Sequence, residues 1–239
     1  MEETYYVGVY WLAREETVDA CAQRAATFFR LLAACDPSLA RWYRKGWTLE
    51  EALQHRVEST KDAFLKEFGP EEERSPLFGV SLGLWSGGPN GDGSSTHISC
   101  GSTSDRVSNS CLFNPPHEGP DAQRLLQTPV LAQVLRAMAL AWEPECGVVT
   151  SNRFRDTLSD SESARAGTFL GWVTYFSHRR GPVPPLPPPV RVEPLEDKGT
   201  LITLSPERFT ASNPAHLEHA RHVTALLSRS GLLRPLRPG

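Results

Sequence analysis

The sequence predicts an α+β fold, in which a mostly antiparallel sheet packs against several helices in a single domain spanning residues 1–239. Three observations support this class. β-prone runs follow one another between residues 79 and 113 and again between 168 and 204, unlike the strand-helix alternation of a doubly wound sheet. Other segments, outside these runs, carry apolar residues at the spacing of a helix. A chain of 239 residues can also build a core without disulfides or metals.

The N-terminal third mixes one strand with several helices. Residues 5–12 are β-rich and apolar on both faces, so we expect a central strand. Residues 17–35 carry apolar side chains at helical spacing and form a helix that Asp36-Pro37 ends. Two or three short helices follow. One of them opens with a capping box, in which Thr48 and Glu51 bond to each other's backbone.

The rest of the chain supplies most of the expected sheet. Thr128-Pro129 predicts a helix with a capping threonine and a proline in its first turn, and Asn213-Pro214 caps a last helix to about residue 228. The proline-rich loop 182–189 is internal, and the tail 230–239 is expected to be flexible. The expected strands are residues 79–85, 94–101, 108–113, 147–151, 168–177, 190–195 and 200–204.

Composition excludes several classes of protein. The net charge of −3 and the pI near 6.2 do not suit a dedicated nucleic-acid binder. No apolar run reaches the roughly 18 residues of a membrane span, and no secretory signal opens the chain. The odd number of cysteines, without a C-x-x-C pair, is typical of reduced thiols. We therefore expect a cytoplasmic protein that binds neither nucleic acid nor membrane directly.

One motif raises the question of catalysis. Gly79-Val80-Ser81-Leu82-Gly83 matches the G-x-S-x-G nucleophile elbow, in which a strand turns sharply into a helix and presents the serine to a histidine. The residues after it cannot begin a helix. Ser81 alternates with Val80 and Leu82 as on one strand face, so we expect a structural serine. A serine hydrolase that uses Ser81 stays open as the alternative function.

No cofactor or metal site is expected. The glycine-rich loop after Trp85 lacks the GK[ST] of a phosphate-binding loop. His216, His219 and His222 lie at spacings of three on the last helix, but they do not converge on one face. The same glycine-rich loop, with Trp85, Asn90 and Asp92, is a candidate recognition surface, because binding residues often lie on loops.

A second candidate surface is acidic. Asp156, Asp160 and Glu162 cluster in a serine-rich segment that we expect to be a loop. They suit either a solvated loop or a surface that meets a basic partner. Aromatic side chains from the strand-forming runs YYVGVYW and TFLGWVTYFS are the competing anchors for such an interface.

Five stretches in this order carry a family resemblance: YYVGVYW, FFRLLAACDPSLARWY, GVSLGLWSGGPNGDG, GWVTYFS and NPAHLEHA. Together they resemble the immunity protein 52 family of bacterial polymorphic toxin systems, from about Tyr5 to Leu227. The resemblance implies a cytosolic antidote rather than an enzyme. Its partner would be a cognate toxin, typically a nuclease of the restriction-endonuclease fold. The stretch with Trp85, Gly87 and Gly88 is the most specific, and no catalytic residue is carried over.

Overall fold

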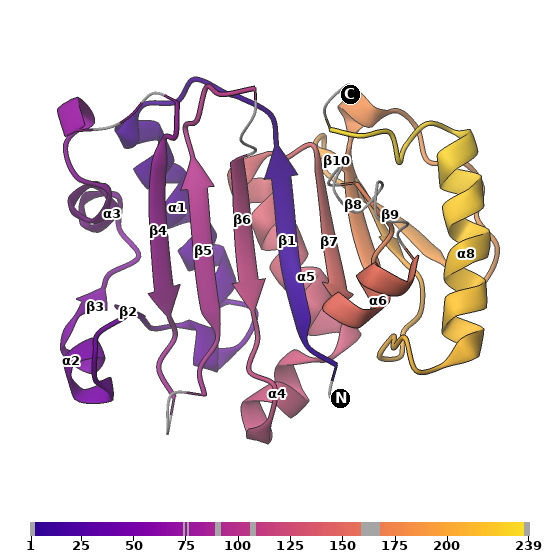
Figure 1. The fold of residues 1–239 in the computed structure, drawn as a ribbon, viewed down its shortest axis with the longest axis horizontal. Coiled ribbons are helices and arrows are strands. Elements are labelled where there is room, and N and C mark those ends of the chain that lie inside the picture. The colour runs from indigo at the N-terminus through magenta and orange to yellow at the C-terminus, as the bar shows by residue number, and fades with distance from the viewer. Residues whose placement is uncertain are drawn as a thin grey trace.

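In the computed structural model, ten antiparallel strands form one sheet in the order β3-β2-β4-β5-β6-β1-β7-β8-β10-β9 (Figure 1). The structure describes residues 3–73, 75, 77–88, 92–105, 109–158 and 168–236. The strands are β1 (Tyr5–Trp11), β2 (Trp42–Arg44), β3 (Arg56–Val57), β4 (Val80–Trp85), β5 (Ser95–Cys100), β6 (Asn109–Asn114), β7 (Cys146–Ser151), β8 (Val173–Ser177), β9 (Arg191–Leu195) and β10 (Gly199–Thr203). The α-helices are α1 (Val18–Ala33), α2 (Leu49–Gln54), α3 (Lys61–Phe68), α4 (Gly119–Leu125), α5 (Thr128–Trp142), α6 (Asn152–Leu158) and α8 (Pro214–Arg229). The predicted α+β class with an antiparallel sheet is confirmed.

Strand β1 lies in the middle of the sheet, as the apolar N-terminal run predicted. It pairs with β6 on one side and β7 on the other, so that Val9 lies opposite both Cys111 and Gly147. The segment of β6 begins 98 positions after the end of β1, and that of β7 begins 135 positions after it. The central strand therefore cannot be paired on both sides until the segments that form β6 and β7 have been synthesised.

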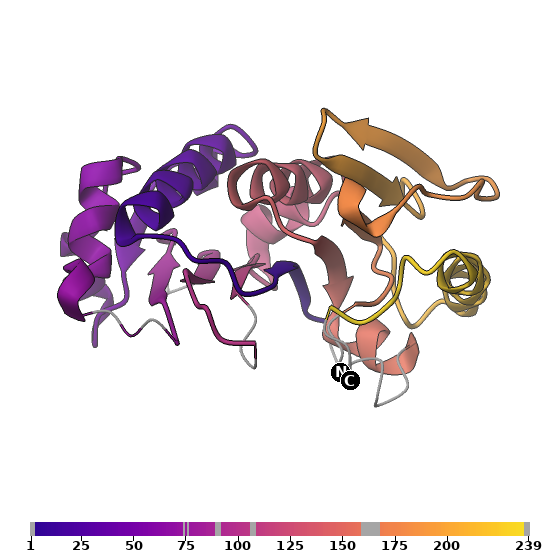
Figure 2. The same cartoon turned by 90° about the horizontal axis from the view of Figure 1, so that it is seen from above.

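Helices α1, α3 and α5 cover one face of the sheet (Figure 2). Thr17 caps α1, because its side chain accepts a hydrogen bond from the Ala20 N–H. The apolar stripes of these helices bury large aromatic rings against the strands. Trp142 of α5 stacks on Trp11 of β1 with ring centroids 5.5 Å apart, which fixes the end of α5 over the central strand.

The opposite face is covered at one end only. β7 and β8 are buried along their whole length, because α6 and α8 lie on the side of the sheet away from α5 (Figure 1). Phe154 of α6 packs edge-on against Phe209 at 5.2 Å, and His216 of α8 stacks on the same ring at 4.3 Å. His216 therefore has a structural role. Along β4, β5 and β6 buried and less buried residues alternate, so this half of the face is open.

Two local expectations are wrong. Thr128 does not cap α5: it is the first helical residue, Gln127 precedes it, and the Thr128 hydroxyl donates to the Pro206 carbonyl at 2.6 Å. The segment expected as an acidic loop begins as helix α6, since burial of Phe154 favours a helix there. In the tail that was expected to be flexible, Leu232 and Leu236 are buried, and residues 237–239 lie outside the described residues. Within the described residues no single helix is long and apolar enough to span a membrane; only α4 and α5 taken together meet that length and composition, and they meet at a 75° bend.

Candidate functional site

The open half of the sheet presents short polar side chains in rows across the strands. Ser81 of β4 lies opposite Ser99 of β5, which lies opposite Ser110 of β6. The next row places His97 opposite Leu112. Among the described residues, this face has few large apolar groups to bury and no covering helix, so it is available to a partner.

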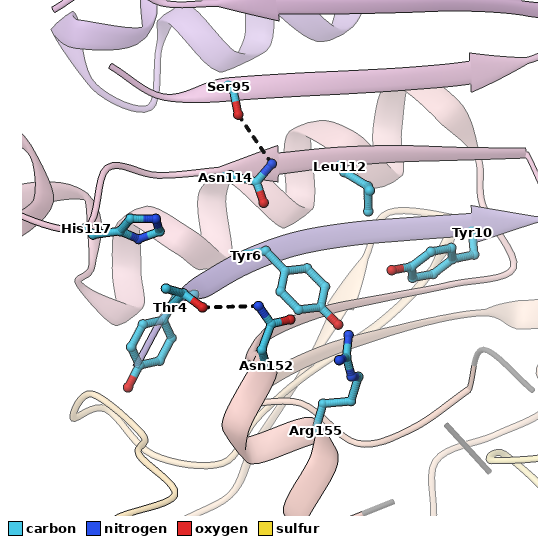
Figure 3. A pocket seen from close by; sticks show the side chains of 10 residues that line it. Thr4, Tyr6, Tyr10, Ser95, Leu112, Asn114, His117, Asn152 and Arg155 are labelled. Atoms are coloured by element: carbon cyan, nitrogen blue, oxygen red, sulfur yellow. Dashed lines mark hydrogen bonds between the residues drawn. The ribbon is translucent and has the colours of Figure 1, made fainter. Parts of the chain in front are cut away.

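A hollow of about 480 Å³ opens where β1 crosses this face (Figure 3). Tyr6 and Tyr10 form its floor, and Arg155 of α6 lies at its side. Gly8 makes room for the floor, because a Cβ at this position would lie 2.6 Å from the Tyr10 hydroxyl and 3.0 Å from Leu112. The glycine thus lets the Tyr10 ring lie flat along the strand.

Charge in this hollow is set by Arg155. The Arg155 guanidinium pairs with Asp156 at 2.8 Å and faces the Tyr6 hydroxyl (Figure 3). Burial raises the pKa of Tyr6 and Tyr10, so both are neutral phenols. Partial burial lowers the pKa of Arg155, but the Asp156 carboxylate and the Tyr6 hydroxyl outweigh this effect and raise it. The hollow therefore offers hydroxyl groups and one partly neutralised cation.

Two further hollows adjoin this one through Ser95. One runs from Asp92 past Asn114 to His117, and the other lies between Trp47 and Trp85. Ser95 lines all three, and the Asn114 side-chain amide donates to its hydroxyl at 3.4 Å. We call this continuous band, at the ends of β4, β5 and β6, the strand-end rim, and its landmarks are Trp47, Trp85, Ser95, Asn114 and Arg155.

The structure brings several of the predicted recognition residues to the strand-end rim. Trp85 ends β4 and lines one hollow, with only 8% of its surface exposed, and Asp92 is exposed in the next hollow. Asp156 lies beside the third hollow on α6, with its carboxylate paired to Arg155. Asn90, Asp160 and Glu162 lie outside the described residues.

The competing aromatic anchors are mostly in the core. In the run YYVGVYW, Trp11 is 2% exposed, and in TFLGWVTYFS, Trp172 is 1% exposed. Neither is available to a partner. The most exposed aromatic residue in the described part of the chain was not among the predicted site residues: Trp47, between β2 and α2, is 97% exposed. The only sequence signal for it is its place immediately before the capping Thr48.

Ser81 is placed as expected for a structural serine. It is the second residue of β4, which continues through Trp85 without turning into a helix. Its hydroxyl is 3.4 Å from His97 Nε2, and Ser99 lies 3.5 Å from the same nitrogen. The polar groups near His97 Nε2 are therefore the hydroxyls of Ser81 and Ser99. A nucleophile elbow has a different backbone and needs a carboxylate to orient the histidine.

Metal ligands do not gather in the part of the chain that the structure describes, where no group of three or more His, Cys, Asp or Glu side chains could hold an ion. His216 is engaged with Phe209 and accepts a hydrogen bond from the Thr210 N–H at 3.0 Å. His222 is exposed on the same helix. The contacts of His216 with Phe209 and Thr210 therefore serve to hold α8 in place.

Comparison with known proteins gives a whole-chain match. The sequence profile of the family described as immunity protein 52 matches residues 3–236. No curated protein sequence matches. Among solved structures, the chain is similar to the Pseudomonas aeruginosa T6SS protein PA0821, with a TM-score of 0.56 and 12% identity. The similarity covers 99% of this chain and 84% of that one, so the two share a fold.

Proposed function

The chain belongs to the immunity protein 52 family, and we propose that it protects a bacterium by binding and neutralising one cognate toxin. The observation that carries this proposal is the family match over residues 3–236, nearly the whole of the sequence. An immunity protein needs a specific binding surface and no chemistry of its own. The strand-end rim is a surface of that kind.

We further propose that the toxin is a nuclease of the restriction-endonuclease fold, as the family resemblance implies. Its substrate is in the cytoplasm, so the antidote acts there too. The T6SS neighbour supports a toxin delivered between competing cells. The mildly acidic chain, with a net charge of −3, would be attracted to the basic substrate-binding face of such an enzyme.

The serine hydrolase is the second candidate, because Ser81 and His97 do lie within 3.4 Å of each other. Three features disfavour it. Ser81 lies in a regular strand, His97 is surrounded by hydroxyls, and the pair is on the open face of the sheet rather than in a closed pocket. A cross-strand contact between polar neighbours accounts for the distance.

Co-expression tests the proposed function. The toxin domain encoded beside this protein is expressed in a bacterial host from an inducible promoter, with and without this chain. We expect growth to be restored only when both are present, and the purified proteins to bind with nanomolar or tighter affinity. A catalytically inactive toxin domain serves as the binding probe. Equal killing with and without this chain contradicts the proposal.

A further inference from the structure

The side chain of Trp47 is the most exposed large apolar group in the described part of the chain, at 97%. Leu49 and Leu53 of α2, next to it, are 43% and 46% exposed. We propose that these three side chains, the Trp47 patch, form the anchor by which the cognate toxin docks. This inference rests on the proposed function and identifies the surface of this chain that the toxin would contact.

The backbone that carries Trp47 is held in place although the side chain is free. The Trp47 N–H donates to the Glu51 carboxylate at 2.9 Å, and the Glu51 N–H donates to the Thr48 hydroxyl at 3.1 Å. Gly46 lies so close to α2 that a Cβ there would be 2.8 Å from the Ala52 nitrogen. Because the backbone here is already fixed, binding need not order it, which favours affinity.

Trp47 has no role in the core that would explain its presence. In many helices the apolar residue before the cap packs onto the fourth helical residue, which is Ala52 here. Ala52 is 5% exposed, yet the indole of Trp47 does not cover it. Exposed indole is unfavourable in water. A residue of this kind on a surface is typical of an interface hot spot.

The hollow beside Trp47 supplies a second, independent observation. Trp85 lines it, is 92% buried, and has an Nε1 atom that is buried without a hydrogen-bond partner in the described structure. Gly93 packs directly against that atom, since a Cβ there would lie 2.6 Å from it. An unpaired buried donor is unfavourable. A carbonyl or carboxylate oxygen of a partner would satisfy it if binding moved the Gly93 backbone aside.

The chemistry around the patch fits a protein partner with an apolar recess. Arg44 pairs with Glu67, and Arg56 pairs with Glu58 at 3.2 Å, so these charges neutralise each other. Lys45 also lines the hollow and is exposed, but nucleic acid and anionic membranes need a cluster of unpaired cations rather than one. Each buried aromatic contributes roughly 150–250 Å². Trp47 with two leucines would thus supply much of the about 800 Å² that one partner buries in a standard interface.

The test is the affinity of variants for the inactive toxin domain. Trp47→Ala should weaken binding at least about 30-fold, the loss expected of a hot spot, while Trp47→Phe should lose less. Phe78→Ala is the matched control: Phe78 is 66% exposed but precedes β4, at the end opposite to Trp85, and its loss should change affinity less than about twofold. Because the indole is exposed, the melting temperature should not change in Trp47→Ala.

The outcomes separate this inference from the proposed function. If the wild-type protein does not bind the toxin domain, the proposed function is wrong as well. If the wild type binds and Trp47→Ala binds equally well, only the docking surface is wrong. A dimer in light scattering that Trp47→Ala abolishes without change in toxin affinity, or Trp47-dependent binding to phosphatidylglycerol vesicles with unchanged toxin affinity, would also overturn it.

Discussion

The Lys198 ammonium lies 2.8 Å from the Glu143 carboxylate, so the turn between β9 and β10 is tied to the residue that ends α5. Arg24 of α1 donates to the other oxygen of the same carboxylate at 3.0 Å. One side chain thus joins three elements distant in sequence. Glu143 adopts a left-handed backbone with φ of 47°, which positions its side chain between the two cations.

Acid should weaken this junction. The contact with Lys198, followed by that with Arg24, lowers the pKa of Glu143 to about 2 from its ordinary value of 4.5. A depressed folded-state pKa means that the stabilisation is complete above pH 4.5 and is lost as the pH falls toward 2. The carboxylate is 37% exposed, so the contribution is about 1 kcal/mol or less. Urea unfolding of the wild type and Glu143→Gln should show a gap at pH 7 that narrows by pH 3; a constant gap would contradict this.

The two glycines of the G-x-S-x-G motif should respond differently to alanine. Gly79 has φ of 68°, and a Cβ there would lie 2.1 Å from the Cys100 carbonyl oxygen, so Gly79→Ala should cost about 2 kcal/mol or more. At Gly83 the nearest atoms are 3.8 Å away, so Gly83→Ala should stay within about 0.5 kcal/mol. Thermal unfolding measures both. In a nucleophile elbow both positions are restricted, so equal sensitivity would favour the hydrolase.

Ser81→Ala should leave toxin protection intact. Its hydroxyl makes one long contact, 3.4 Å to His97, on an open face of the sheet. We expect a change in unfolding free energy below about 1 kcal/mol and full growth rescue on co-expression with the toxin domain. A fluorophosphonate probe tests the alternative directly, because it labels an activated serine. Labelling of native protein that Ser81→Ala abolishes would make the chain a hydrolase.

The acidic segment remains a predicted contributor to association rate. Reversing Asp156, Asp160 and Glu162 to lysine should slow association with a basic toxin, most at low salt, where screening is weakest. The matched control reverses three exposed acidic residues near β10, at positions 196, 197 and 207, and changes the net charge equally. Stopped-flow measurements between low and high salt compare the two. Equal rates for both variants would place the acidic segment outside the interface.

Most of the sheet was predictable because its strands carry their own signal. In β4 the apolar residues Val80, Leu82 and Leu84 alternate with Ser81 and Gly83, and the same alternation appears as burial. Helix α6 was not predictable in this way. Ser151 caps it by accepting a hydrogen bond from the Phe154 N–H at 3.0 Å, and Phe154 packs on Phe209. That ring is 55 positions away in a sequence that gives no sign of their contact.

The residues of the candidate site were also predictable only in part. Trp85 and Asp92 were predictable as neighbours on one loop, since loop tips are common binding surfaces. Their junction with Arg155 along the strand-end rim depends on strand order, which local sequence does not encode. Trp47 was missed for another reason. An apolar residue immediately before a helix cap usually packs onto the first turn of the helix. In the structure, the side chain of Trp47 is instead exposed to solvent.

The central position of β1 has a consequence for the timing of protection. Ribosomes add roughly 5–20 residues per second, so the 141 positions between Tyr5 and Cys146 correspond to roughly 7–28 s of synthesis. For about the first 104 of these positions, up to Asn109, β1 is made without either of its neighbours, and for the rest it still lacks β7. A newly made chain therefore gives no protection until the segment of β7 has emerged.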